Sequence, residues 1–240
     1  MANSFFQFKQ FRVDQEGAVM KVCTDSCLLG AYAANYLQQL VPIPNQILDI
    51  GTGSGVLALQ MAQKFQGFID ALELDEGSFG QAVFNFGQSP WKDRVRAFQG
   101  DIRVWESDTR YDFILCNPPF YQKDLRSSSP EKNRARHASS LSYAELLVAI
   151  QTHLDPAGSF GVLLPYDQFG FFQELSLGVG FPAQEILQIR PTPGKEFFRT
   201  IAIFKRGPGE LKEKQLAIRE EAGNYSPAFR DILQDYYLAL

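Results

Sequence analysis

From residue 46 onward, short apolar runs alternate with longer stretches in which apolar residues recur at helical spacing. The apolar runs predict strands at 46–50, 68–75, 94–101, 111–117 and 158–166, and the longer stretches predict helices at 54–65, 77–89, 142–154 and 168–178. Strands that alternate with helices favour right-handed crossovers, and therefore a mostly parallel sheet with helices on both faces.

Two further apolar runs, 181–191 and 199–206, have no helix between them. We therefore expect them to pair as a hairpin, which places one antiparallel strand in the sheet. The sequence thus predicts a Rossmann-like α/β fold whose sheet is seven-stranded, mostly parallel, and has an antiparallel C-terminal hairpin strand. The six-stranded, all-parallel sheet of dinucleotide dehydrogenases does not fit this pattern.

The sequence predicts a segment before this core and another after it. Residues 1–45 should form a cap segment packed on the core, with a helix that begins near Asp25 or Ser26. Residues 46–206 should form the core itself. The charged tail, 207–240, is expected to be an extension that wraps around the surface or extends from it.

Composition narrows the class of protein. The chain has 240 residues, 45% of them apolar, which suits one large domain. Its net charge of −4 means that a nucleic acid would need a local basic patch. Three cysteines are too few for a disulfide scaffold, and the pair Cys23 and Cys27 lacks the partners of a zinc site, so no metal is expected. Without a signal peptide or a segment long enough to span a bilayer, we expect a soluble, cytoplasmic protein with no membrane or obligate protein partner.

A glycine-rich loop follows the first core strand, in the stretch DIGTGSG at 49–55. Glycines at 51, 53 and 55 allow positive φ and let a ligand approach the backbone closely. The spacing is G-x-G-x-G, which is not the dinucleotide fingerprint, and a tight turn without a ligand also fits it. Because no Gly-Lys-Ser/Thr follows, the loop does not resemble a site for a triphosphate.

Carboxylates stand at the ends of the next two predicted strands. Glu73 lies about 20 residues past the glycines, where an acidic side chain can accept both ribose hydroxyls. Asp101 ends the third strand and can accept from the exocyclic amine of adenine. Either residue alone would also fit a solvated surface group or a helix cap. Their placement along one edge of the sheet points to a nucleoside.

The fourth core strand ends in NPPF, residues 117–120. Proline has no N–H, and a residue before proline is held extended. We therefore expect a stiff turn that presents the Asn117 side-chain oxygen and the Pro118 carbonyl to one cleft. Two fixed acceptors suit an –NH2 group, and Phe120 supplies a flat face on which a ring can stack.

Hydrogen bonds from an exocyclic amine to two fixed oxygens draw it towards tetrahedral geometry and turn its lone pair out of the ring plane. An amine held in this way can attack an electrophile, which a cofactor must supply. S-adenosyl-L-methionine matches the features at the strand ends, because it is an adenosine without phosphate that carries a methyl sulfonium. Positioning and a dry pocket should supply most of the rate, since the methylated amine sheds its own proton.

The stretches DIGTGSG, ELD, GD and NPPF together resemble the class I S-adenosylmethionine-dependent methyltransferases that methylate amines. FRVDQEGAVMKVCTDSCLLGAYA, SPW, and NPPFY followed by ARH are similar to the bacterial tRNA1(Val) adenine-37 N6-methyltransferase family. The likeness runs from about residue 5 to residue 206, and the tail lies outside it.

The resemblance implies a role at each matching position. Asn117 and Pro118 would hold the amine of a tRNA adenine, with Phe120 stacked on the base. The cofactor would lie against Thr24, Asp25, Asp49, Gly51, Gly53, Gly55, Glu73, Asp101 and Asn117, with Glu73 on the ribose, Asp101 on the adenine, and Asp49 and Gly51 facing the methionine part. Thr24 and Asp25 fit an ordinary helix cap equally well.

An acidic protein that holds tRNA needs a local basic surface. The stretch 121–137 beside NPPF carries five cations against two acids, and its cations are Lys123, Arg126, Lys132, Arg134 and Arg136. Lys195 and Arg199 flank the predicted hairpin turn. A solvated face is the other interpretation, and whether His137 contacts RNA stays open.

Three other functions remain to be weighed. The N-P-P turn also serves enzymes that methylate a glutamine side chain of release factors at N5, but those usually carry an N-terminal helical domain, for which the 45 residues before the first core strand are few. A DNA adenine methyltransferase would normally need a target-recognition domain, for which this chain has no room. A non-catalytic nucleotide-binding module would leave NPPF unexplained.

Overall fold

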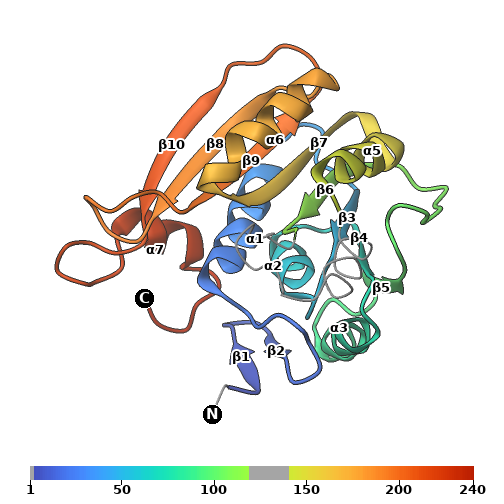
Figure 1. Ribbon diagram of the computed structural model, residues 1–240. Helices are drawn as coiled ribbons and strands as arrows, with labels where there is room; N and C mark the ends of the chain where they lie inside the picture. Colours follow the sequence, from blue (N-terminus) through green and yellow to red (C-terminus); the bar gives the residue numbers. More distant parts are fainter. Residues whose placement is uncertain (1–2, 119–140) are drawn as a thin grey trace, which may run out of the picture.

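The computed structural model describes residues 3–118 and 141–240, and the larger of the two sheets in these residues has eight strands, is twisted and carries helices on both faces (Figure 1). The eight strands lie in the order β10-β8-β9-β7-β6-β3-β4-β5. Their bounds are β3 Gln46–Ile50, β4 Phe68–Glu73, β5 Val95–Gln99, β6 Tyr111–Cys116, β7 Leu154–Pro165, β8 Ala183–Arg190, β9 Arg199–Lys205 and β10 Lys212–Ala217. Only β9 runs antiparallel to its neighbours within this sheet of described residues. The predicted Rossmann-like fold and its hairpin strand are confirmed.

The helices divide between the two faces according to their apolar side chains. The helices are α1 Thr24–Leu37, α2 Val56–Lys64, α3 Glu76–Gln88, α5 Tyr143–His153, α6 Tyr166–Gly178 and α7 Pro227–Leu233. Helices α1, α2, α3 and α7 share one buried cluster with the side chains of one face of the sheet, and α5 and α6 share a second cluster with the other face. Helices therefore cover both faces of the sheet and bury them from solvent, as is usual for a mostly parallel sheet.

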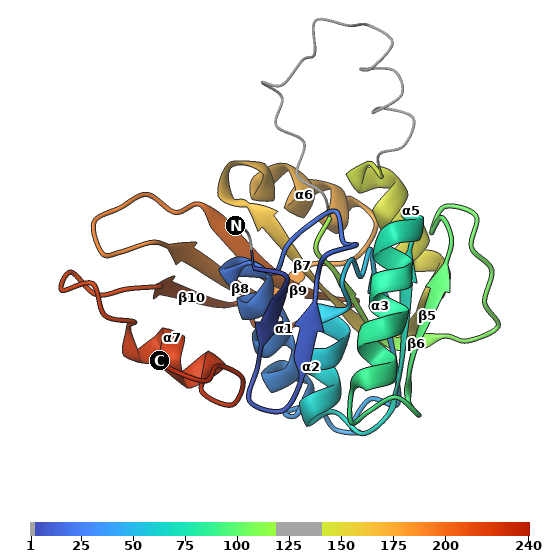
Figure 2. The ribbon, with the colours of Figure 1, turned by 90° about the horizontal axis from the view of Figure 1, so that it is seen from below.

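A small hairpin of β1 (Phe5–Gln7) and β2 (Arg12–Asp14) lies on the face covered by α1, α2 and α3 (Figure 2). Asn85 of α3 ties it down, because its amide donates to the backbone oxygens of Asp14 and Ser54, both at 2.8 Å. The segment that follows the hairpin is thereby held beside the glycine loop.

The eighth strand is a feature that the sequence did not predict, so the expected number of seven strands was one too low. Strand β10 lies at the edge of the sheet and pairs in parallel with β8. Its sequence, KEKQLA, is exposed over the first four residues and so lacks the apolar run by which the other strands are recognised. Edge strands are often charged because this discourages pairing with another chain.

The segment 207–240 also contributes to the core through α7 and the residues after it. Phe229, Leu233 and Tyr236 are fully buried, and the Tyr236 hydroxyl donates to the backbone oxygen of Gln60 in α2 at 3.0 Å. Replacing Phe229 with alanine should therefore leave a cavity and lower the free energy of unfolding by about 3–5 kcal/mol. Urea unfolding monitored by circular dichroism measures this.

Leu238→Ala is the matched control, because Leu238 is 63% exposed and its loss should change the free energy of unfolding by less than about 0.5 kcal/mol. A loss below about 1 kcal/mol for Phe229→Ala would contradict the packing of α7 on the core.

Candidate active site

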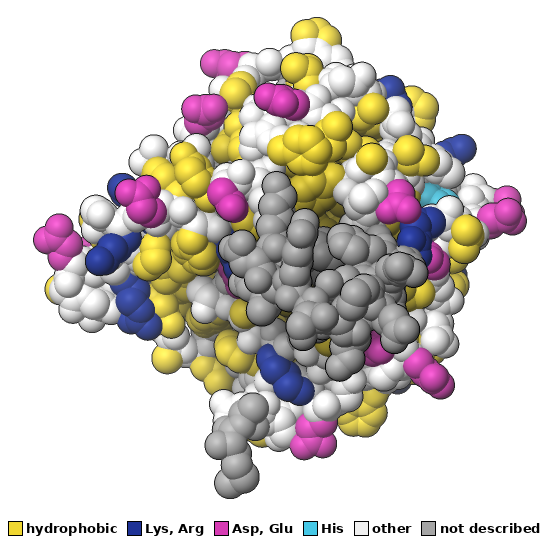
Figure 3. Space-filling model, in the orientation of Figure 1, with side chains coloured by type: hydrophobic (Ala, Val, Ile, Leu, Met, Phe, Trp, Pro, Cys, Tyr) yellow, Lys and Arg dark blue, Asp and Glu magenta, His cyan; other side chains and the backbone are white. Residues whose placement is uncertain are grey.

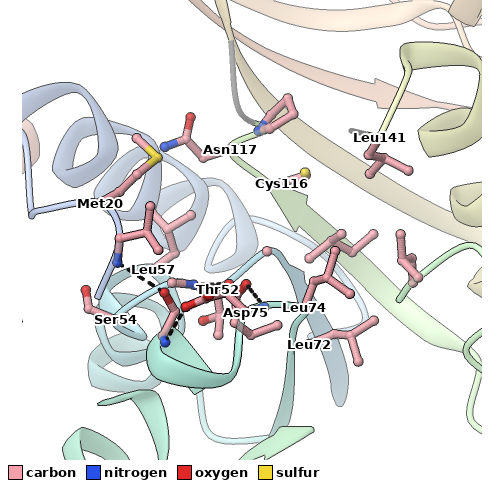
Figure 4. A pocket seen from close by; sticks show the side chains of 18 of the residues that line it. Met20, Thr52, Ser54, Leu57, Leu72, Leu74, Asp75, Cys116, Asn117 and Leu141 are labelled. Atoms are coloured by element: carbon pink, nitrogen blue, oxygen red, sulfur yellow. Dashed lines mark hydrogen bonds between the residues drawn. The ribbon is translucent and has the colours of Figure 1, made fainter. Parts of the chain in front are cut away.

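A cavity of about 690 Å³ opens at the carboxyl ends of β3, β4, β5 and β6. Its walls are the segment 19–23, the glycine loop, the ends of β4 and β5, and residues 116–118 (Figure 4). Ligands of open α/β sheets bind at this edge of the sheet, at the point where the strand order reverses. Here that point lies between β3 and β6, directly beside the glycine loop.

The glycine loop is shaped for close approach of a ligand. Gly51, Gly53 and Gly55 have φ values of 71°, 58° and 86°. A Cβ on Gly53 would meet nothing within 4 Å, whereas a Cβ on Gly55 would overlap the ring of Phe86. Gly53 therefore leaves open space at the cavity wall, and Gly55 lets α2 and α3 pack closely behind it.

Glu73 lines the cavity at the end of β4, and both of its carboxylate oxygens accept from backbone. The Gly53 N–H donates to Oε2 at 2.8 Å, and the Asp75 N–H donates to Oε1 at 2.9 Å. The carboxylate thus braces the glycine loop against the end of β4. Its remaining lone pairs can accept from a ligand.

Asp101 lines the cavity at the end of β5 and is held by its neighbour Arg103. The Arg103 Nε lies 3.0 Å from both carboxylate oxygens, and these hydrogen bonds lower the pKa of Asp101. The carboxylate is therefore ionised near neutral pH and fixed as an acceptor.

Asp49 lies near the end of β3 and is fully buried, and it is not among the residues that line the cavity. The Thr52 hydroxyl donates to its Oδ2 at 2.6 Å, and Oδ1 has no hydrogen-bond partner among the described residues. Burial, reinforced by the nearby charge of Glu73, raises the pKa of Asp49 to about 7. A buried carboxyl of this kind can pair with a cation brought by a ligand.

This raised pKa predicts a pH effect on stability in the absence of cofactor. As the pH rises from about 4 to about 7, the unfolded chain releases the Asp49 proton while the folded chain keeps it, so the free energy of unfolding falls. Asp49→Asn removes this effect. Urea unfolding across this range should show Asp49→Asn gaining stability relative to the parent chain as the pH rises, and a relative loss would contradict the buried setting.

Asn117 and Pro118 follow β6 and line the cavity beside the buried Cys116. The Asn117 Oδ1 is shielded from solvent by protein and has no hydrogen-bond partner among the described residues. Because a buried acceptor without a donor costs about 1–3 kcal/mol, this atom points to a donor supplied by a ligand. Phe120, the predicted stacking residue, lies outside the described residues.

Thr24 and Asp25 begin α1 and do not line the cavity. Asp25 instead forms an ion pair with Arg199, whose Nε lies 2.8 Å from Oδ2. The neighbouring Cys23 and Ser26 do line it, together with Val19, Met20, Lys21 and Val22. Sequence reasoning missed this wall, although the short apolar run Ala18, Val19 and Met20 just before the predicted helix was a usable signal.

The predicted RNA contacts are only partly described. Lys123, Arg126, Lys132, Arg134 and Arg136, and also His137, lie outside the described residues. Lys195 is exposed in the hairpin turn between β8 and β9. Figure 3 shows acidic and basic side chains interspersed over the described part of the face in view.

Two further features of the described residues concern metal binding and membrane spans. In residues 3–118 and 141–240, no group of three or more His, Cys, Asp or Glu side chains could hold a metal ion. Within the same residues, no helix has the length and apolar content needed to cross a membrane.

The cavity has features that S-adenosyl-L-methionine would require. Open space at Gly53, carboxylates at the ends of β4 and β5, and the unpartnered oxygens of Asp49 and Asn117 suit a nucleoside with a cationic substituent. The glycine loop carries no lysine, in keeping with a ligand without phosphates. The residues present therefore fit this cofactor.

Comparison with known proteins agrees with this geometry. Residues 32–155 match the family described as methyltransferase small domain. A tRNA1(Val) (adenine(37)-N6)-methyltransferase of Dyadobacter fermentans is 41% identical over 241 residues, which cover 98% of each chain. Further relatives at 32–36% identity carry the same name.

Two solved structures share the fold. A predicted O-methyltransferase of Agrobacterium tumefaciens has a TM-score of 0.67 at 15% identity and covers 90% of this chain and 99% of its own. A glycopeptide N-methyltransferase complexed with S-adenosyl-L-methionine has a TM-score of 0.54 at 14% identity and covers 75% and 94%.

The strand order, the cavity and the glycine loop define a class I S-adenosylmethionine-dependent methyltransferase. The unpartnered acceptor at Asn117 adds a feature suited to an amine. By its relatives over nearly the whole chain, the protein belongs to the tRNA1(Val) (adenine(37)-N6)-methyltransferase family.

Proposed function

We propose that this protein transfers a methyl group from S-adenosyl-L-methionine to the exocyclic N6 amine of adenine 37 in valine tRNA. The observation that carries the amine part is the buried, unpartnered Oδ1 of Asn117 at the wall of the cavity. The acceptor molecule follows from the relatives, which bear this name and align over 98–100% of the chain.

The chain acts on the amine by holding it. Asn117 Oδ1 and the Pro118 carbonyl oxygen accept its two N–H groups, which fixes its position and turns its lone pair towards the cavity. The cofactor supplies an electrophilic methyl group when it is bound. Buried Cys116 and Pro118 exclude water from this corner, so the acceptors act at low dielectric, where they are strongest.

The cofactor is assigned to the ends of the strands. Glu73 accepts the ribose hydroxyls, Asp101 accepts the adenine amine, and the glycine loop lies against the methionine part. Asp49 supplies a buried carboxyl behind that loop, and a cationic ligand beside it would favour the ionised form. Asp25 belongs to this site only indirectly, because its ion pair with Arg199 fixes the start of α1 beside Cys23 and Ser26.

The RNA is assigned to the cations around the catalytic turn. The stretch 121–137 adds five of them next to Asn117 in the sequence, and Lys195 stands exposed in the hairpin turn. A target base in a tRNA loop can leave its stack at little cost, so it can reach the cavity. We propose a cytoplasmic location, because the tRNA substrate would be met there.

Incubation with labelled S-adenosyl-L-methionine and separate pools of tRNA, DNA and release factor tests the acceptor. The proposal expects label in tRNA alone. Label in the release factor would replace it with glutamine methylation, and label in DNA would replace it with DNA adenine methylation. The absence of label from all three, with cofactor still bound, would contradict a transferase with any of these acceptors.

A further inference from the structure

Met20 lines the mouth of the cavity, and the proposed function gives it no role. Its side chain is 50% exposed, although methionine is usually buried in soluble proteins. An exposed apolar side chain at the entrance of a cavity offers a contact surface to whatever enters.

The backbone around Met20 is held on both sides. The Val19 N–H donates to the hydroxyl of Ser78 in α3 at 3.2 Å, and the Val22 N–H donates to Oε1 of Gln15 at 2.8 Å. Lys21 also donates to the backbone oxygen of Gln15. The position of Met20 is thus set by α3 and by the segment after the N-terminal hairpin, so its exposure is part of the fold.

The direction of the side chain relates Met20 to the chemistry. In Figure 4 the thioether of Met20 points towards the side-chain amide of Asn117, on the side of its nitrogen. Leu141 lines the same cavity from the far side. A ring that enters the cavity with its amine at Asn117 would therefore lie between apolar side chains, Met20 on one side and Leu141 on the other.

We propose that Met20 is a positioning residue that supports the ring of the target adenine while Asn117 holds its amine. The inference rests on the proposed function. Thioether sulfur makes favourable contacts with aromatic rings, and the unbranched side chain of methionine adapts to the shape that it meets. Met20 thereby fixes the ring beside the two acceptors.

Replacing Met20 with alanine should lower kcat/KM for tRNA about threefold to tenfold, the range expected from losing one such contact. The dissociation constant for S-adenosyl-L-methionine, measured by calorimetry, should stay within about twofold. Met20→Leu should restore kcat/KM to within about twofold of the parent enzyme, because it keeps an apolar side chain of similar volume.

Leu177→Ala is the matched control, since Leu177 is 62% exposed on α6 and does not line the cavity. It should leave both constants unchanged. Unchanged kcat/KM for tRNA in Met20→Ala, or a cofactor dissociation constant that rises as much as kcat/KM falls, would overturn the inference. A parent enzyme that methylates no tRNA would overturn the proposed function first, and the two failures are thereby distinguished.

Discussion

Asn117→Ala should lower kcat for methyl transfer to tRNA by about a hundredfold or more, the loss typical of removing one fixed hydrogen-bonding group from a catalytic site. The Asn117 Oδ1 is buried at the cavity wall without a partner among the described residues, so the truncation removes an acceptor that only a ligand would use. Single-turnover kinetics with saturating tRNA measure the loss directly.

Cofactor binding by Asn117→Ala shows whether the variant has lost a contact to the amine or a contact to the cofactor. Because Asn117 acts on the amine, the dissociation constant for S-adenosyl-L-methionine should stay within a few fold. Asn224→Ala, in an exposed turn, is the matched control and should leave kcat unchanged. Loss of cofactor binding in Asn117→Ala would show instead that Asn117 is chiefly a cofactor ligand.

Glu73→Ala should raise the dissociation constant for S-adenosyl-L-methionine about a hundredfold or more. Hydrogen bonds to a charged group contribute about 1.5–3 kcal/mol each, and the carboxylate is assigned two from the ribose. It also accepts from the N–H groups of Gly53 and Asp75, so its loss releases the loop that shapes the cavity. Isothermal titration calorimetry measures the change.

Weaker cofactor binding by Glu73→Ala could also result from a loss of folded structure, and two further variants and the melting temperature separate the two causes. Glu73→Gln keeps one acceptor oxygen and should give an intermediate dissociation constant. Glu174→Ala, which removes an exposed carboxylate on α6, should match the parent enzyme. If Glu73→Ala keeps its melting temperature and binds the cofactor within threefold of the parent, the assignment of Glu73 to the ribose is wrong.

Much of the fold could be predicted from the sequence, because β3 to β9 each contain several apolar residues and because glycines and prolines lie near their ends. Strand β10 escaped prediction for a physical reason. It lies at the edge of the sheet, exposed over most of its length, so burial imposes no apolar pattern on it. The burial of Phe229 and Tyr236 also depends on the distant helices α1 and α2, which the local sequence does not reveal.

The candidate site, too, could be predicted only where it does not depend on contacts between residues distant in the sequence. The glycine loop, Glu73, Asp101 and Asn117 could be found because parallel strands bring their carboxyl ends to one edge. The partner of Asp25 could not be found, because Arg199 stands 174 residues away and meets it only when β9 enters the sheet. The orientation of Met20 likewise depends on contacts with α3.

The central claim is that two fixed oxygens hold the exocyclic amine of an adenine beside a methyl donor. Mass spectrometry of nucleosides from valine tRNA, after reaction with labelled S-adenosyl-L-methionine, tests it most directly. We predict a single labelled product, N6-methyladenosine, mapped to position 37. A methyl group on a ring nitrogen, a ring carbon or a ribose hydroxyl would contradict the account, because none of these presents two N–H groups to Asn117 and Pro118.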